Sequence, residues 1–223
     1  MDKFVIVSPR SYPYENYIRY LHDIAEIKFI PDEIGEIHPR KYKGLILIGG
    51  EDVHPKFYNE ENLYSEIDEE RDIIEFEILD KFVNYQRMVF GICRGLQVIN
   101  VFFKGSLYQD IPKQLNSYIH KYYEDKTPKQ VEVFNNDTYH KVKIISENPF
   151  FKEIEFIVNS RHHQAIKDLA KDFYAFAISE DGIIEAIAHK KLLIFAVQWH
   201  PERVKSEYNK ISKRILQVLS TYD

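Results

Sequence analysis

The chain has 223 residues, of which 44% are hydrophobic, and its formal net charge is −5. This length suits one large α/β domain or two small ones, and the mild acidity gives no support for nucleic-acid binding, which requires a basic face. The single cysteine excludes an intramolecular disulfide and favours a cytosolic enzyme. No apolar run approaches the roughly 18 residues of a membrane span, and Phe4–Val7 is too short for a signal-peptide core. We therefore expect a cytoplasmic protein without nucleic-acid or membrane partners.

Short apolar runs alternate with amphipathic segments through the first half of the chain. The runs predict strands over residues 4–7, 27–30, 44–48 and 88–92. Apolar residues at helical spacing predict helices near Tyr17 and Leu96, and the clearest helix covers Arg71–Gln86. This alternation favours a parallel, doubly wound sheet with right-handed crossovers, in which ligands bind outside the carboxyl ends of the strands.

The pattern changes after Gly105, where shorter strands follow one another with polar connections. We predict these strands over residues 106–111, 130–134, 142–145 and 156–158, and a hairpin of residues 173–178 with 183–188 around Asp181-Gly182. A last buried strand over residues 192–197 precedes a helix over residues 208–218. We expect a single α/β domain over residues 1–223, with a mostly parallel central sheet and a small antiparallel excursion.

The only cysteine lies in the pattern Gly91-x-Cys93-x-Gly95, between a predicted strand and a predicted helix. A sharp strand-to-helix turn exposes a nucleophile in the same way in α/β hydrolases, where the residue is a serine. Glycines are needed there because the backbone is strained and side chains on the flanking residues would collide. The helix N-terminus favours a thiolate over a thiol. On this turn alone, a small buried core residue remains an equal alternative.

His200 and Glu202 follow the last predicted strand, with Pro201 turning the chain between them. A carboxylate on one ring nitrogen would fix the tautomer and leave the other nitrogen for a sulfur. His-Pro-Glu alone is more often a simple loop. Gly49-Gly50 ends an earlier strand, where a backbone without side chains can approach a ligand or form a simple turn. The histidines at residues 22, 38 and 189 are best explained as surface residues.

Seven motifs follow one another from Gly44 to Glu202. They are Gly49–Tyr58, Arg71–Glu75, Gly91–Asn100, Gly105–Asp110, Asn159–Gln164, Asp181–Glu185 and Gln198–Glu202. In this order they resemble the class I glutamine amidotransferase-like superfamily. Within it, the chain is most similar to the stand-alone, γ-glutamyl-γ-aminobutyrate hydrolase-like enzymes of the peptidase C26 group. The resemblance implies a flavodoxin-like, three-layer αβα sandwich.

The resemblance also implies a Cys-His-Glu triad and a reaction without a cofactor. Cys93 would attack a γ-glutamyl amide, His200 would protonate the departing amine and later activate water, and Glu202 would orient His200. The backbone N–H groups of Gly50 and Arg94 would form the oxyanion hole. Substrate contacts would come from Gln97 and from the segment His162, His163 and Gln164, which the family places by the substrate cleft. Asn59 and the segment Phe103-Lys104 depart from the family pattern, which leaves the leaving group less certain than the chemistry.

The adjacent residues His162 and His163 also invite a metal site. Neighbouring residues on a strand point in opposite directions, and no second ligand pair has the usual spacing, so we predict no metal. Three functions remain in competition: a γ-glutamyl amide hydrolase acting on a small-molecule substrate, a glutaminase subunit that delivers ammonia to a synthase partner, and a non-catalytic binding module. The segments His162-His163-Gln164 and Asp52-x-x-Pro55 favour the hydrolase over the glutaminase, and the intact triad argues against the binding module. A homodimer is left open.

Overall fold

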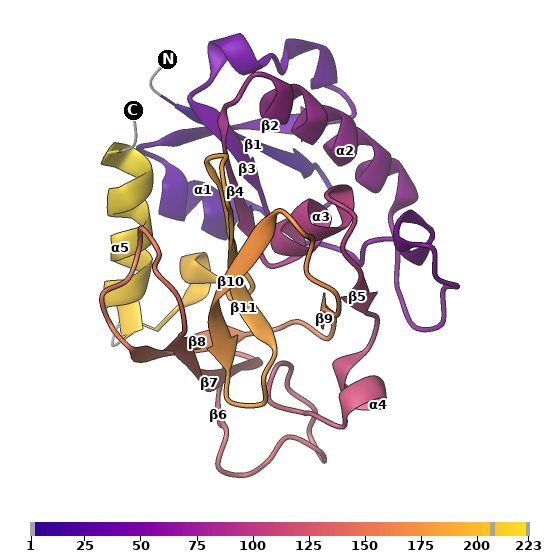
Figure 1. Cartoon of the computed structure of the whole chain (residues 1–223), viewed down its shortest axis with the longest axis vertical. Helices are drawn as coiled ribbons and strands as arrows, with labels where there is room; N and C mark the ends of the chain where they lie inside the picture. Colours follow the sequence, from indigo (N-terminus) through magenta and orange to yellow (C-terminus); the bar gives the residue numbers. More distant parts are fainter. Residues whose placement is uncertain (1–2, 206–207, 222–223) are drawn as a thin grey trace.

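The computed structural model describes residues 3–205 and 208–221, so residues 1–2, 206–207 and 222–223 of the predicted domain lie outside the described residues. One sheet runs through the molecule in the order β2-β1-β3-β4-β12-β11-β10-β7-β6, with β8 paired to β7 (Figure 1). Its strands are β1 (Phe4–Pro9), β2 (Ala25–Ile30), β3 (Gly44–Leu47), β4 (Met88–Ile92), β6 (Glu132–Phe134), β7 (Asp137–Ile144), β8 (Glu155–Ser160), β10 (Phe173–Ser179), β11 (Ile184–His189) and β12 (Ile194–Val197). A separate pair is formed by β5 (Leu107–Tyr108) and β9 (Ala165–Ile166). The α-helices are α1 (Glu15–Leu21), α2 (Glu69–Asn84), α3 (Arg94–Phe102), α4 (Ile111–Leu115) and α5 (Asn209–Thr221).

Strands β2, β1, β3, β4 and β12 form the parallel half of the sheet. Successive side chains of a strand point to opposite faces, and β1 divides accordingly. Phe4 and Ile6 pack in one apolar cluster with residues of α1 and α5, whereas Val5 and Val7 pack in another with residues of α2 and α3. Helices therefore cover both faces, and the predicted three-layer αβα architecture is confirmed (Figure 1).

The antiparallel strands continue this sheet and are more extensive than the small excursion that the sequence predicts. One edge of β12 pairs with β4 in parallel, and its other edge pairs with β11 antiparallel. An unpaired strand edge leaves backbone groups without hydrogen-bond partners. The strands β11, β10, β7 and β6 therefore extend the sheet beyond β12, each pairing with the edge of the strand before it. The predicted hairpin is present between β10 and β11, and Gly182 in its turn has φ 87°.

Helix α2 shows why helix boundaries are difficult to predict from periodicity alone. The sequence places its beginning at Arg71, but the helix begins at Glu69. The carboxylate of Asp68 accepts a hydrogen bond of 3.0 Å from the backbone N–H of Arg71. This N-terminal cap satisfies a backbone donor that the first turn leaves free, and it fixes the start of the helix before the apolar stripe begins.

The carboxyl ends of β3, β4 and β12 lie side by side at one edge of the parallel half. The chain segments that leave these strands carry Gly49-Gly50, Cys93 and His200, so the topology brings three separate motifs to one place. Within residues 3–205 and 208–221, no helix has the length and apolar character needed to cross a membrane.

Candidate active site

Cys93 lies at the turn between β4 and α3, where the sequence places it. Its backbone has φ 53° and ψ −105°, a sparsely populated conformation that costs about 1–3 kcal/mol. A Cβ atom at Gly91 would lie 2.7 Å from the carbonyl carbon of Gly95, and one at Gly95 would lie 2.3 Å from the carbonyl oxygen of Leu47. Gly91 is therefore required by a close contact across the turn, as predicted, whereas Gly95 is required by the close approach of the neighbouring strand β3.

The side chains of Cys93, His200 and Glu202 meet above the carboxyl end of the sheet. His200 Nδ1 lies 2.8 Å from Glu202 Oε1, and a carboxylate only accepts, so Nδ1 carries a hydrogen and Nε2 is left for the sulfur. Burial lowers the pKa of His200, but the charges of Cys93 and Glu202 and hydrogen bonds to both residues outweigh burial and raise it well above its usual value. Imidazole and sulfur are therefore in contact, which a thiol nucleophile with a histidine base requires.

A pocket of about 430 Å³ opens onto these side chains. It is lined by Tyr12, Pro13, Asn16, Tyr17, Gly50, Cys93, Arg161, His200, Glu202 and Arg203. Cys93 is 8% exposed, so the sulfur is mostly covered but faces the pocket. The guanidinium groups of Arg161 and Arg203 lie 3.7 Å and 2.6 Å from Asp137 Oδ1. These two cations were missed by sequence reasoning, although Arg161 lies within the motif Asn159–Gln164 and Arg203 directly follows Glu202.

Comparisons with known proteins identify the family of this chain. The family model described as Peptidase C26 matches residues 32–202. This chain belongs to the peptidase C26 family. It is 36% identical to the glutamine amidotransferase-like protein YvdE of Lactococcus lactis, with 79% of this chain and 72% of that protein covered. It is 30% identical to the γ-glutamyl-γ-aminobutyrate hydrolase of Escherichia coli O157:H7, with coverages of 84% and 72%. Among solved structures, a glutamine amidotransferase of Thermotoga maritima has the same fold, with a TM-score of 0.61, 18% identity and coverages of 97% and 82%.

A buried network of charges supports the glycine pair of this C26 chain. Arg71 donates to the carbonyl oxygen of Gly49 at 2.8 Å and to Glu75 Oε1 at 2.8 Å. Arg94, at the start of α3, pairs through its side chain with Asp72 and with the second oxygen of Glu75. We call these four residues (Arg71, Asp72, Glu75 and Arg94) the arginine network. Burial raises the pKa of Glu75, but the two guanidinium groups outweigh it and lower the pKa below its usual value.

The glycine pair itself is held near His200 by Tyr17 and by the arginine network. The hydroxyl of Tyr17 accepts a hydrogen bond of 3.2 Å from Gly49 N and lies 3.3 Å from His200 Nδ1. A Cβ atom at Gly50 would lie 2.0 Å from Arg71 Nη1, so only glycine leaves room for the guanidinium. Gly50 lines the same pocket as Cys93, and the backbone of Arg94 follows Cys93 directly. The assignment of the oxyanion hole to the N–H groups of Gly50 and Arg94 stays a prediction.

None of the four predicted substrate-binding residues belongs to the described lining of this pocket. Gln97 is buried, and its Nε2 donates to the carbonyl oxygen of Gln164 at 3.2 Å. The side chain of Gln164 donates to the hydroxyl of Ser65 at 2.7 Å. The rings of His162 and His163 point to different partners, as predicted, because His163 Nε2 lies 3.0 Å from Asp52 while His162 is directed into a cluster of histidines.

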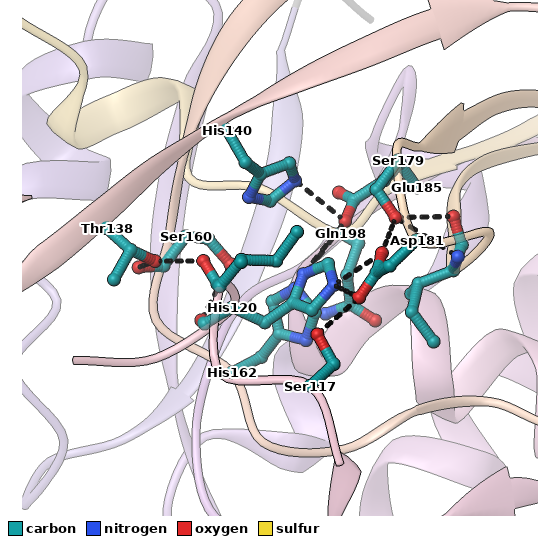
Figure 2. Close-up of polar contacts among 12 residues, drawn as sticks. Ser117, His120, Thr138, His140, Ser160, His162, Ser179, Asp181, Glu185 and Gln198 are labelled. Atoms are coloured by element: carbon teal, nitrogen blue, oxygen red, sulfur yellow. Dashed lines mark hydrogen bonds and ion pairs between the residues drawn. The ribbon is translucent and has the colours of Figure 1, made fainter. Parts of the chain in front are cut away.

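The histidine cluster consists of His120, His140, His162, Asp181 and Glu185, and it lies on the antiparallel half of the sheet (Figure 2). The sequence gives no sign of it, because its members come from different strands and loops. Burial lowers the pKa of His162 to about 4. Burial also acts to lower the pKa of His120, but hydrogen bonds to Asp181 and Glu185 outweigh it and raise the pKa to about 9. Glu185 is completely buried, and its pKa lies well below its usual value because the charge of His140 and the hydrogen bonds of the three histidines outweigh burial.

Proposed function

We propose that this chain hydrolyses the amide bond between the γ-carboxyl group of glutamate and an amine, through a thioester on Cys93. The observation that carries the proposal is the contact of His200 with Cys93 on one side and with Glu202 on the other, at a strained turn that opens onto a pocket. The membership of the C26 family and the similarity to a γ-glutamyl-γ-aminobutyrate hydrolase support the substrate class.

The first half of the reaction transfers the glutamyl group to the enzyme. Cys93 Sγ attacks the γ-carbonyl carbon, and the electron pair of the C=O bond moves to oxygen. The backbone N–H groups of Gly50 and Arg94 stabilise that oxyanion, and one such donor contributes roughly 10²–10³-fold to kcat. The tetrahedral intermediate collapses, the C–N bond breaks, and the amine leaves with a proton from His200 Nε2. A γ-glutamyl thioester and a free amine result.

The second half regenerates the thiolate. His200 removes a proton from a water molecule, and the hydroxide attacks the thioester carbonyl carbon through the same oxyanion site. The C–S bond breaks and glutamate is released, while His200 keeps the proton that stabilises the thiolate. Glu202 holds the ring in one tautomer in both halves, because its carboxylate accepts the hydrogen on Nδ1. The cationic side chains of Arg161 and Arg203 are positioned to attract carboxylate groups of the substrate.

A panel of γ-glutamyl amides tests the proposal, with γ-aminobutyrate, polyamine, polyglutamate and nucleotide-linked leaving groups beside glutamine. We expect glutamate release from at least one amide and a glutamyl adduct on Cys93 in the acid-quenched protein by mass spectrometry. Cys93→Ala should abolish both. Glu202→Gln should lower kcat by roughly 10²–10⁴-fold with little change in KM, because the wrong tautomer is no longer excluded.

Two outcomes would contradict the proposal. If no amide yields glutamate and no adduct forms, the site does not perform this chemistry. If glutamine alone reacts, and a synthase partner raises that rate, the chain is a glutaminase subunit that supplies ammonia. Circular dichroism of each variant, compared with that of the wild type, shows whether the loss of activity comes from the site or from unfolding.

A further inference from the structure

The hydrogen bonds around the histidine cluster determine which ring nitrogens carry a lone pair. His162 Nδ1 lies 2.8 Å from the carbonyl oxygen of Gln164, which can only accept, so Nδ1 carries the hydrogen and Nε2 carries the lone pair. His120 Nε2 lies 3.1 Å and 3.0 Å from the two carboxylate oxygens of Asp181, which assigns the hydrogen to Nε2 in the same way. In the neutral ring, His120 Nδ1 is then also an acceptor.

These lone pairs converge on the carboxylate of Glu185 (Figure 2). Glu185 Oε1 lies 3.3 Å from His120 Nδ1 and 3.8 Å from His162 Nε2, and one ligand atom from each of the three residues lies within 4.8 Å of the others. His120 Nδ1, His162 Nε2 and Glu185 Oε2 are buried without a hydrogen bond. Both ring nitrogens face Glu185 Oε1, and the raised pKa of His120 places a proton on its Nδ1 in the metal-free protein, which a bound metal ion would replace.

The spacing suits a metal ion. Zinc binds imidazole nitrogen and carboxylate oxygen at about 2.0–2.2 Å, which in a tetrahedral site separates two ligand atoms by about 3.3 Å. The separation from His120 Nδ1 to Glu185 Oε1 equals this value and that from His162 Nε2 is 3.8 Å, while the three ligand atoms together span up to 4.8 Å, so His162 must move toward the other two ligands to complete the geometry.

The groups behind the three ligands have the arrangement that metal sites use to orient histidines. A histidine ligand usually donates its second ring N–H to a carboxylate or a backbone carbonyl. His120 does so to Asp181, and His162 does so to Gln164. Asp181 is itself held by the hydroxyl groups of Ser117 and Ser179, and His140 Nε2 lies 3.1 Å from Glu185 Oε1 and orients that carboxylate.

We propose that His120 Nδ1, His162 Nε2 and the carboxylate of Glu185 bind one divalent transition-metal ion, for which this buried nitrogen and oxygen set fits Zn²⁺ best. The metal site considered from the sequence is formed by the adjacent residues His162 and His163. In the site proposed here His163 takes no part, and the other two ligands, His120 and Glu185, come from distant segments of the chain. Three protein ligands leave one position of a tetrahedral ion for a water molecule or another small ligand.

The ion would stabilise one wall of the region around Cys93. Gln164 O, which fixes the His162 tautomer, also accepts a hydrogen bond from Gln97, and Gln97 Nε2 lies 3.4 Å from Gln198 Oε1. Gln198 Nε2 in turn lies 3.7 Å from Cys93 Sγ, and Gln198 N donates to the backbone carbonyl of Glu185 at 2.7 Å. The metal site and the nucleophile are thus joined by a short chain of buried amides.

The test is calorimetric titration of the full chain with Zn²⁺ after treatment with a chelator. We expect saturation at about one ion per chain and a thermal midpoint that rises with the concentration of Zn²⁺. Glu185→Gln and His162→Gln should remove this binding, and Asp181→Asn should weaken it by about 10–100-fold, because Asp181 supports a ligand without touching the ion. His22→Gln, which alters an exposed histidine, is the matched control and should bind as the wild type does.

Substitution with Co²⁺ in the wild type keeps the proposal testable if a buried variant fails to fold. Visible d–d absorption of a four- or five-coordinate ion, and a ¹⁵N shift of His120 Nδ1 typical of a metal-bound nitrogen, would support it. A wild-type protein that takes up no stoichiometric ion, or a folded Glu185→Gln variant that binds as tightly as the wild type, would overturn it. In that case a proton on His120 Nδ1 compensates the negative charge of Glu185.

Discussion

The two halves of the sheet each hold a buried polar cluster, and the clusters differ in how their charges are compensated. In the arginine network on the parallel half, two guanidinium groups face two carboxylates, and each carboxylate accepts from an arginine. In the histidine cluster on the antiparallel half, three histidine rings share the one carboxylate of Glu185, with His140 Nε2 at 3.1 Å, His120 Nδ1 at 3.3 Å and His162 Nε2 at 3.8 Å from the same oxygen. The first cluster pairs its carboxylates with guanidinium groups and supports the glycine pair, whereas the second has the composition of a binding site.

Arg94→Met should have the largest effect, because it breaks the compensation of the first cluster. Asp72 and Glu75 would stay buried without one of their cations, and removal of one partner of a buried ion pair costs about 3–5 kcal/mol. Urea unfolding followed by circular dichroism measures this loss. Lys81→Met on the exposed side of α2 is the control and should change the free energy of unfolding by less than about 0.5 kcal/mol. A loss below 1 kcal/mol for Arg94→Met would mean that water enters the network and compensates the carboxylates.

Glu185→Gln, measured in the presence of a chelator, should cost less, about 1–3 kcal/mol. The amide oxygen of glutamine can still accept from His140, and Asp181 remains beside His120. The same unfolding measurement repeated with Zn²⁺ should widen the gap between wild type and variant, because only the wild type gains from the ion. An equal gap in both conditions would remove the distinction between the clusters. Glu180→Gln in the exposed hairpin turn is the matched control.

The smallest expected effect concerns His200, which follows β12, the strand that joins the parallel and antiparallel halves. Its pKa is raised above the ordinary value of about 6.5, so the favourable interaction of the protonated ring is complete below that pH and is lost as the pH rises through the folded pKa. Cys93→Ala removes a charge that raises the pKa of His200, so the lowering of this pKa by burial is opposed less strongly. We expect the midpoint of the His200 NMR titration to fall by at least about one unit, equivalent to about 1.4 kcal/mol. An unchanged midpoint would show that Glu202 alone holds the proton on the ring.

The sequence predicts those structural features that depend on residues close to one another in the chain. The spacing of Gly91, Cys93 and Gly95 predicts their turn. His200 and Glu202 lie two residues apart after a recognisable strand, so both groups can be found from the sequence alone. The histidine cluster could not, because His120, His140 and Glu185 meet through the pairing of distant strands and loops. Apolar periodicity shows which face of a strand is buried but not which strand lies beside it. The same limit explains why the extent of the antiparallel half was underestimated.

The place of β12 in the sheet has a consequence for how the protein is made on the ribosome. Gln198 and Cys93 are 105 residues apart, yet β12 lies between β4 and β11 at the centre of the sheet. During translation, the first four parallel strands emerge with the edge of β4 still open, and the antiparallel strands have no partner that links them to it. Such contacts between distant segments form slowly and leave hydrophobic edges exposed. We expect the nascent chain to depend on chaperones until β12 leaves the exit tunnel, and the thiol to stay without its imidazole until then.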